Sequence, residues 1–428
     1  MRYIELTSPS DIKQTVKLLQ ESSLGKLNEV EETVKGIIGN IREFGDAALA
    51  EYTQRFDHCK LEQFAVTEKE IQDACDEVSP SLLEAIKQAK ENIELYHSLQ
   101  KYSPVEINKP GITIYQVARP INRVGIYIPG GSYPYPSTLL MAAIPAICAG
   151  VKEIAVATPP GENGSINANI LAAAKICGIT EIYKAGGAQA IAALAYGTES
   201  IKRVDKICGP GNAYVTSAKR LVFGDVGIDM LAGPSEVLII ADESSNAAYV
   251  ASDMLAQAEH DENAQAVLIT NSRPLAQQAI AQLQKQLSEL PADSLAHASI
   301  EKNGCVLLVQ SLSDAMEISN ALAPEHLELA VADCNSLLAM VENAGSIFVG
   351  EYTPEPVGDY FAGTNHTLPT SGTARFFSPL STYDFLKRSS VLHYSKEQLN
   401  EAKDMIAVLA RAEGLEAHAR SVLRRFNG

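Results

Sequence analysis

The sequence lacks the cysteine arrangements that mark a zinc ribbon or a disulfide-stabilised domain. Its seven cysteines are odd in number, scattered along 428 residues, and include no Cys-x-x-Cys pair. Zinc ribbons need closely spaced cysteines, and small secreted domains need an even set that can pair. We therefore expect free thiols and a location in the reducing cytoplasm.

Long apolar segments and an excess of basic residues are also missing. The N-terminus has no apolar core of the kind found in a signal peptide. The longest apolar run, residues 139–149, is too short to span a bilayer and contains Pro145. The formal net charge of −17 would repel the phosphates of a nucleic acid. The sequence thus predicts a soluble protein with neither a membrane nor a nucleic-acid partner, and its length is enough for two or more cores.

What the sequence does contain is an alternation of short apolar strands with helical segments. Residues 1–102 place apolar residues at helical spacing and predict a helical start. From Gly111 onward, strands alternate with Ala-rich helices, which predicts βαβ units, two α/β modules and largely parallel sheets. A polar, glycine-rich loop is expected over 358–379, and a helical tail over 396–426. The expected strands are 112–117, 123–128, 153–158, 181–184, 204–208, 236–241, 264–270, 305–309, 326–330 and 346–349.

Two glycine-rich turns follow expected strands, Ile128-Pro-Gly-Gly-Ser132 and Cys208-Gly-Pro-Gly-Asn212. Such turns let the backbone approach a phosphate or a ribose closely, and they also occur as tight turns that bind nothing. Neither turn has the spacing G-x-G-x-x-G. A dinucleotide would therefore be held without that fingerprint.

A pair of potential metal ligands, Gln257 and His260, lies in a helical stretch over residues 254–263. Side chains three residues apart leave the same face of a helix, so both could reach one divalent cation. A solvated helix end is the alternative interpretation.

Further polar pairs fit catalysis, although each alone also fits an ordinary surface. Glu325 and His326 are adjacent just before an expected strand and could serve two separate proton transfers. Histidine is the usual base for oxidising an alcohol near neutral pH. Two other pairs lie in the expected loop and in the tail, namely Asp359 with His366 and Glu413 with His418.

Taken together, these motifs resemble the histidinol dehydrogenase family. They follow one another in the family's order over nearly the whole chain from about residue 110, and more loosely before it. The motifs are Val124-Gly-Ile-Tyr-Ile-Pro-Gly-Gly131, Gly186-Gly-Ala-Gln-Ala-Ile191, Gly209-Pro-Gly-Asn212, Ala232-Gly-Pro-Ser-Glu236, Gln257-Ala-Glu-His260, Pro324-Glu-His326, Gly358-Asp359, Asn365-His-Thr-Leu-Pro369 and Glu413-Gly-Leu415.

The resemblance implies two successive NAD-dependent oxidations, from L-histidinol through L-histidinal to L-histidine, the last steps of histidine biosynthesis. It implies a homodimer with shared active sites and one zinc ion per subunit. His326 matches the family's base, and Glu325 matches the residue that activates water for the aldehyde step. The implied zinc ligands are Gln257, His260, Asp359 and His418 of the partner subunit. The implied substrate contacts are Ser235, His366 and Glu413 together with His326 and the zinc ligands, and the implied NAD contacts are Tyr127, Gln189 and Asn212.

The family's architecture implies two Rossmann-like domains that lack the usual fingerprint. A helical segment over residues 1–22 would precede them. Residues 23–126 and 236–380 would form the domain with the metal and catalytic residues, and residues 127–235 the NAD domain. Residues 381–428 would form a helical tail that reaches the partner subunit.

Other functions stay open on the residues alone. A relative could oxidise another small amino alcohol or diol on the same scaffold. A zinc hydrolase is allowed by the polar residues, but the sequence has no H-E-x-x-H. A non-catalytic metal-binding or amino-acid-binding protein would leave Glu325 and His326 idle. The mechanistic alternative is a covalent thiohemiacetal on a cysteine, although Cys148 lies in an apolar run and Cys208 has no evident base nearby in the sequence.

Overall fold

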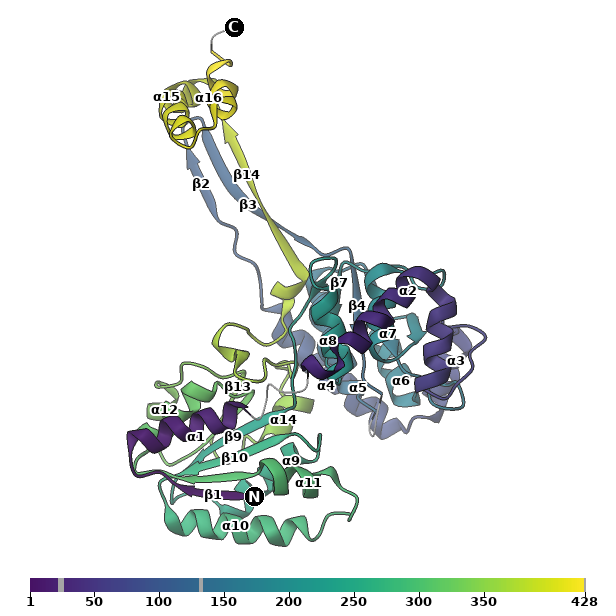
Figure 1. Cartoon of the computed structure of the whole chain (residues 1–428), viewed down its shortest axis with the longest axis vertical. Helices are drawn as coiled ribbons and strands as arrows, with labels where there is room; N and C mark the ends of the chain where they lie inside the picture. The colour runs from purple at the N-terminus through teal and green to yellow at the C-terminus, as the bar shows by residue number, and fades with distance from the viewer. Residues whose placement is uncertain (22–26, 131–133, 427–428) are drawn as a thin grey trace. The chain divides into compact units, whose positions relative to one another are not determined.

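The computed structural model describes residues 1–21, 27–130 and 134–426, and the chain divides into two compact units (Figure 1). The larger unit comprises residues 1–100 and 122–384, and the smaller unit comprises residues 101–121 and 385–428. Among the described residues, no helix combines the length and the apolar character needed to cross a membrane.

A six-stranded parallel sheet forms one half of the larger unit. Its four inner strands are mostly apolar and buried, as expected where helices cover both faces of a sheet, whereas its two edge strands are partly exposed. In spatial order, the strands are β1 (Arg2–Glu5), β11 (Cys305–Leu308), β10 (Gln265–Thr270), β9 (Glu236–Ala241), β12 (His326–Ala330) and β13 (Ser346–Val349). One core is shared with α1 (Pro9–Glu21), α12 (Leu312–Leu322) and α13 (Cys334–Leu338), and the other with α9 (Ala247–Ala258), α10 (Arg273–Leu287) and α11 (Leu295–Asn303).

A five-stranded parallel sheet forms the other half of the larger unit. Its spatial order is β6 (Glu181–Lys184), β5 (Glu153–Thr158), β4 (Arg123–Tyr127), β7 (Lys206–Cys208) and β8 (Gly227–Ile228). It shares a core with α2 (Leu27–Phe56), α7 (Gly187–Tyr196) and α8 (Ala213–Val222). The helices α5 (Pro136–Ala149) and α6 (Ala168–Ile176) pack together and against α3 (Glu68–Glu77) and α4 (Pro80–Ser98).

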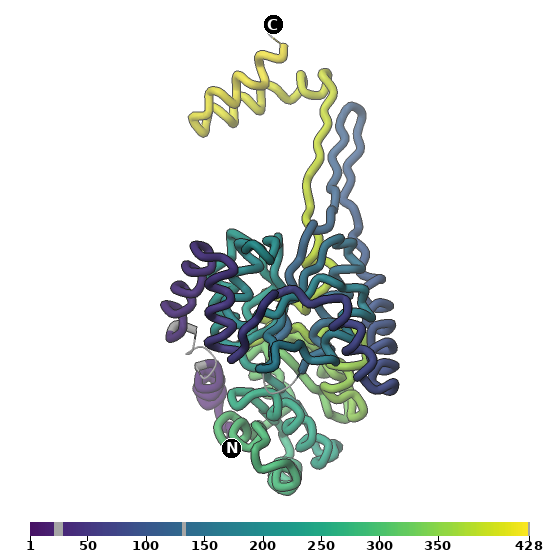
Figure 2. Tube along the Cα trace, turned by 90° about the vertical axis from the view of Figure 1, so that its right-hand side faces the viewer, coloured from purple at the N-terminus to yellow at the C-terminus, as the bar shows by residue number. Residues whose placement is uncertain are grey.

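The smaller unit is an antiparallel sheet followed by two helices (Figure 2). The strands pair in the order β14 (Leu386–Tyr394), β3 (Ile112–Pro120) and β2 (Glu106–Lys109). The helices are α15 (Lys396–Ala412) and α16 (Glu416–Leu423), and their small common core consists of Ala407, Ala410 and Ala419.

The predicted α/β class with two parallel sheets is confirmed, and β5, β6, β9, β12 and β13 have the expected bounds. Two expectations were wrong. Residues 2–5 form a strand rather than a helix, because they pair with β11, far along the chain. Residues 112–120 belong to an antiparallel sheet, because their partner is β14 at the start of the segment that was expected to be a helical tail.

The structure also bears on the expected domain division. Helix α2 and strand β4 were both expected in the domain of the metal ligands, yet α2 shares a core with α7 and α8, and β4 is a central strand of the five-stranded sheet. The expected boundary between residues 22 and 23 lies outside the described residues. The domain limits themselves therefore stay a prediction.

Candidate active site and metal centre

A cluster of buried polar side chains gathers where β9 and β12 begin. Glu236 is the first residue of β9, and His326 is the first residue of the neighbouring strand β12. Glu325, which precedes β12, is buried beside them. Open parallel sheets usually bind ligands at the carboxyl ends of their strands. This cluster lies at the opposite, amino-terminal edge of its sheet.

The backbone of Glu236 fixes both side chains that the sequence predicts to be catalytic. Its N–H donates to Glu325 Oε2 at 2.8 Å, and its carbonyl oxygen lies 3.0 Å from His326 Nδ1. A carbonyl oxygen can only accept, so Nδ1 carries a hydrogen, and Nε2 is the ring atom left to exchange a proton with a ligand. The Nε2 atom is buried and has no hydrogen-bond partner among the described residues. Asp359 Oδ1 lies 3.8 Å from it, too far for a hydrogen bond.

Two carboxylates of the cluster come from the short helix α14 (Glu355–Tyr360). Glu355 and Asp359 are four residues apart, so their side chains lie on the same face of the helix. The expectation of a loop around Asp359 was therefore wrong, because the helix begins before the glycine-rich stretch. Glu355 was missed altogether, although the spacing Glu-x-x-x-Asp after Pro354 was a signal that could have identified it.

His260, Glu355 and Asp359 could hold one metal ion. Each offers a ligand atom, and these atoms lie within 4.8 Å of one another. Neighbouring ligands about 2.1 Å from a tetrahedral zinc ion would be about 3.4 Å apart, so modest side-chain movements would close the site. Imidazole and carboxylate together suit zinc. The residues present therefore fit a zinc ion, and Glu355 joins the expected ligands.

Gln257 and His260 lie at the end of α9 rather than on one helical face. The helix ends at Ala258, so Gln257 is in its last turn and His260 follows it. Gln257 is fully buried. One arm of its amide lies 3.2 Å from the carbonyl oxygen of Glu236 and 3.0 Å from a carboxylate oxygen of Glu355. Because both are acceptors, that arm is the amide nitrogen, and the oxygen lies on the other arm.

The cluster crowds several carboxyl groups and imidazole rings into a buried space. Burial raises the pKa of Glu325 to about 7 and that of Glu355 to about 8. Burial alone would lower the pKa of His326, but the carboxylates of Glu355, Glu325 and Asp359 outweigh it and raise this pKa well above its usual value. Burial alone would raise the pKa of Asp359, yet the nearby His326 and His366 rings lower it. So many buried carboxyl groups favour a bound cation.

The predicted substrate residues of the larger unit border this cluster. A ring nitrogen of His366, Nδ1, lies 3.2 Å from the backbone carbonyl oxygen of Asp359. Its loop is anchored by Asn365, whose side-chain amide donates to the carbonyl oxygen of Met141 at 2.7 Å. Ser235 immediately precedes Glu236 and is half-buried. Their roles in substrate binding stay predictions.

The other two predicted active-site residues, Glu413 and His418, lie in the smaller unit. Glu413 follows α15, His418 lies in α16, and both side chains are exposed. Their roles also stay predictions.

Two of the three predicted NAD contacts meet at the carboxyl edge of the five-stranded sheet. The Tyr127 hydroxyl accepts a hydrogen bond from the backbone N–H of Gly187 at 3.0 Å, and Gln189 is buried in the same helix, α7. The third, Asn212, is the exposed N-cap of α8, and its side-chain oxygen accepts from Tyr214 N at 3.0 Å. This capping role explains Asn212 without a ligand, so its contact with NAD stays a prediction.

Close packing explains the glycines of both turns at this edge. A β-carbon on Gly209 would lie 2.1 Å from the Tyr127 carbonyl oxygen, and one on Gly130 would lie 2.1 Å from Pro159 Cγ. Residues 131–133 of the first turn lie outside the described residues. The turns therefore need no ligand to account for their glycines, and phosphate binding there stays a prediction.

The cysteine chemistry considered above has no support at the two positions named. Cys208 is fully buried, and burial raises the pKa of its thiol far above its usual value. Burial also raises the pKa of Cys148. Since the thiolate is the nucleophile, neither residue is set up for a thiohemiacetal route.

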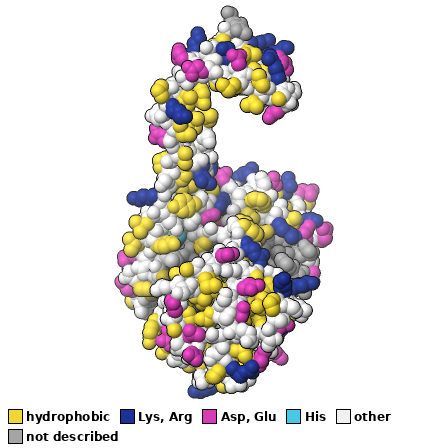
Figure 3. Space-filling view, turned by 90° about the vertical axis from the view of Figure 1, so that its left-hand side faces the viewer, with side chains coloured by type: hydrophobic (Ala, Val, Ile, Leu, Met, Phe, Trp, Pro, Cys, Tyr) yellow, Lys and Arg dark blue, Asp and Glu magenta, His cyan; other side chains and the backbone are white. Residues whose placement is uncertain are grey.

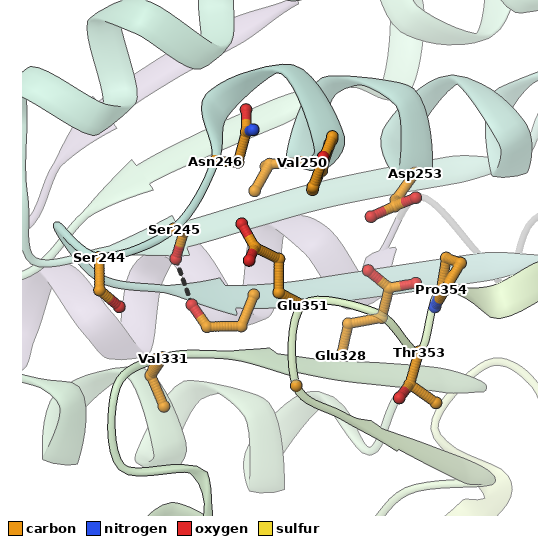
Figure 4. Close-up of a pocket in the computed structure, with 13 residues that line it drawn as sticks. Ser244, Ser245, Asn246, Val250, Asp253, Glu328, Val331, Glu351, Thr353 and Pro354 are labelled. Carbon is orange, nitrogen blue, oxygen red and sulfur yellow. Dashed lines mark hydrogen bonds between the residues drawn. The ribbon is translucent and has the colours of Figure 1, made fainter.

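A separate pocket lies at the carboxyl ends of β9, β12 and β13 (Figure 4). Asp253 and Glu328 line it, and the Glu328 carboxylate accepts a hydrogen bond from the backbone N–H of Glu355 at 2.9 Å. Its volume of about 180 Å³ is well below the roughly 300–1,000 Å³ of pockets that hold drug-sized ligands. It is too small for a dinucleotide.

Comparison with known proteins adds independent information. The family model for histidinol dehydrogenase matches residues 20–426. The chain is 52% identical over 416 residues to the histidinol dehydrogenase of Bacillus cereus, covering 96% of each chain. It is 48% identical over 420 residues to that of Streptococcus mutans, covering 97% of this chain and 98% of the relative. The crystal structure of histidinol dehydrogenase from Elizabethkingia anophelis is similar with a TM-score of 0.94 at 40% identity, covering 100% of this chain and 99% of that one.

Proposed function

Because this chain belongs to the histidinol dehydrogenase family, we propose that it oxidises L-histidinol through L-histidinal to L-histidine with NAD as the hydride acceptor. These are the last steps of histidine biosynthesis. The observation that supports the proposal most strongly is the orientation of His326. Its Nδ1 is held by the Glu236 carbonyl oxygen, while its buried Nε2 has no hydrogen-bond partner among the described residues and lies 3.8 Å from Asp359 Oδ1.

In this proposal, Nε2 of His326 takes the hydroxyl proton as the hydride leaves the carbinol carbon. Oxidation of an alcohol needs both a base and a hydride acceptor. The aldehyde must first add water, and we assign that activation to Glu325. Burial raises the pKa of Glu325 to about 7, which suits a group that exchanges protons near neutral pH.

The metal ligands on this chain would be Gln257, His260 and Asp359, with Glu355 as a further ligand or close support. When bound, zinc would hold the amino and imidazole nitrogens of the substrate and so fix the carbinol carbon before the base. Ser235 and His366 border this cluster and would complete the substrate pocket from the same unit.

NAD would bind at the carboxyl edge of the five-stranded sheet, where Tyr127, Gln189 and Asn212 lie. This is the edge at which open parallel sheets bind nucleotides. The Gly187 N–H and the Tyr127 hydroxyl already meet there, on two neighbouring elements. Asp57 lies beside Gly186 at the same edge, and its buried Oδ2 has no hydrogen-bond partner within the described residues.

We further propose a homodimer in which the tail of each chain completes the site of the other. The smaller unit supports this, because it leaves large apolar side chains in solvent (Figure 3). Met405, Val408 and Leu409 of α15 are 71%, 65% and 68% exposed and lie on one helical face. An apolar face of this kind marks a surface that another chain covers. His418 and Glu413, exposed on the same unit, would then enter the site of the partner.

All seven cysteines are free, which supports the proposed cytoplasmic location. The alternative function is oxidation of another small amino alcohol or diol by the same fold. The polar cluster alone does not distinguish histidinol from such a substrate.

The deciding experiment follows NADH absorbance with L-histidinol and with a panel of small amino alcohols and diols. The zinc-loaded protein should use L-histidinol with the highest kcat/KM, lose activity after metal removal, and regain it with zinc. A clean zinc-loaded preparation that forms no NADH from histidinol would contradict the proposal. A higher kcat/KM for another alcohol would favour the alternative function.

A further inference from the structure

Asp57 is a half-buried residue with one carboxylate oxygen, Oδ2, that is enclosed by the fold. It follows Phe56, the last residue of α2, and its backbone N–H donates to the Thr53 carbonyl oxygen at 2.9 Å. The carbonyl end of a helix carries a partial negative charge, which disfavours an acidic side chain there. Oδ2 of Asp57 is buried and has no hydrogen-bond partner within the described parts of the chain.

Burial without a hydrogen-bond donor destabilises the ionised form of a carboxyl group and therefore raises its pKa. Burial raises the pKa of Asp57 to about 6, and the exposed imidazole of His58 offsets only part of the effect. Unpaired buried polar groups are rare in proteins and need an explanation, such as a ligand that supplies the missing donor.

The neighbours of Asp57 define where such a ligand would lie. A β-carbon built on Gly186 would be 3.3 Å from Asp57 Oδ1 and 2.5 Å from Pro159 Cβ. Pro159 directly follows β5, and Gly186 precedes α7 at the end of the loop after β6. The segment that follows Asp57 pairs with β6, because the Lys184 N–H donates to the Phe64 carbonyl oxygen at 2.8 Å.

Asp57 therefore lies at the carboxyl edge of β5 and β6, next to the proposed NAD site. The Gly187 N–H and the Tyr127 hydroxyl meet at this same edge. The hydroxyl of Thr158, the last residue of β5, is a second buried polar group there with no partner in the described chain. A ribose offers neighbouring hydroxyl donors, and a carboxylate at this edge of a Rossmann-like sheet is suited to accept from them.

We propose that Asp57 binds the adenosine ribose of NAD through its 2′-hydroxyl and so selects NAD over NADP. The inference rests on the proposed NAD-dependent function. The nicotinamide end must reach His326, which belongs to the other sheet, so the end that remains at β5 and β6 is the adenosine. NADP carries a phosphate in place of this 2′-hydroxyl. The negative charge of the phosphate would repel the Asp57 carboxylate, and the hydroxyl that donates a hydrogen bond to Asp57 would be absent.

The test is direct binding of dinucleotides to Asp57→Asn, measured by calorimetry on the full-length zinc-loaded protein. A hydrogen bond to a charged group contributes about 1.5–3 kcal/mol, so the Kd for NAD should rise by about 10–100-fold. The ratio of the NADP Kd to the NAD Kd should fall at least about tenfold. Histidinol binding should stay unchanged. Glu51→Gln, an exposed acid on the same helix, is the matched control and should change none of these values.

The folding of the variant is checked by thermal unfolding without ligand. Replacing a carboxylate whose enclosed oxygen has no donor in the described chain should leave the unfolding midpoint equal or higher. Should the variant fold poorly, the wild-type protein gives the same answer with an NAD analogue that lacks the adenosine 2′-hydroxyl, which should bind about tenfold or more weakly than NAD.

Equal affinities for NAD and this analogue, or an unchanged NADP-to-NAD ratio in a folded Asp57→Asn, would overturn the inference while leaving the proposed function intact. A wild-type protein that binds no NAD would contradict the proposed function itself.

Discussion

Substitution of Glu355 offers the sharpest test of the metal centre. The structure groups Glu355 with His260 and Asp359, whereas the sequence motifs did not identify Glu355 as a metal ligand. We predict that Glu355→Gln weakens zinc binding while preserving the fold. The backbone N–H of Glu355, which donates to Glu328, is untouched by the change. The amide of glutamine has nearly the same volume as the carboxylate and is neutral.

The magnitude follows from the position of the Glu355 carboxylate. A residue that merely supports a metal ligand is worth about 10–100-fold in metal affinity. A Glu355 oxygen lies within 4.8 Å of the ligand atoms of both His260 and Asp359, so it is at least such a support. The zinc Kd, measured by competition with a coloured chelator, should therefore rise at least about tenfold.

The same substitution should change how the stability of the metal-free protein depends on pH. Burial raises the pKa of Glu355 from 4.5 to about 8, so the folded chain binds this proton more tightly than the unfolded chain. The free energy of unfolding should then fall as pH rises from about 4.5 to about 8, at up to about 1.4 kcal/mol per pH unit for this group. Glu355→Gln removes this contribution and should be more stable than wild type by a few kcal/mol at the upper end of that range.

Glu351→Gln is the matched control, because Glu351 is an exposed acid four residues earlier. It should alter neither the zinc affinity nor the pH dependence of unfolding. A folded Glu355→Gln protein whose zinc Kd stays within about twofold of wild type would refute the assignment of Glu355 to the metal centre.

Three further predictions concern the chemistry. His326→Asn should reduce both oxidations by about 10²–10⁴-fold in kcat, because general-base catalysis is worth that much; retention of either oxidation at the wild-type rate would contradict its role as the shared base. Glu325→Gln should reduce oxidation of added histidinal more than oxidation of histidinol, and equal losses in stopped-flow measurements would undo the division of roles. Mixing inactive His418→Ala and Glu325→Gln subunits should restore part of the activity, since one site of a mixed dimer would be intact, and no recovery would indicate self-contained subunits.

The parallel sheets could be predicted because most of their inner strands are short, mainly apolar runs between turns. Strands β9 and β12 have the expected bounds, since both are buried on two faces and carry their signal locally. The strand β1 could not be predicted, because only its pairing with β11 makes residues 2–5 extended. The same holds for β14, whose partner β3 precedes it by most of the chain.

The candidate site was predictable in its motifs and less so in its geometry. The adjacency of Glu325 and His326 marked a catalytic pair, but nothing local showed that the backbone of Glu236 would orient both. Asp359 was read as part of a loop, and this hid the helical spacing that brings Glu355 to the same face. The proposed role of His418 as a zinc ligand requires a second chain. The local sequence around His418 therefore cannot show which residues it would meet.

The most direct measurement is the ratio of NADH formed to L-histidinol consumed by the zinc-loaded protein, with the product identified. We predict about two NADH per histidinol, with L-histidine as the product, because an alcohol becomes an acid through two hydride transfers. About one NADH per histidinol with histidinal accumulating, or no NADH at all, would contradict the proposed reaction.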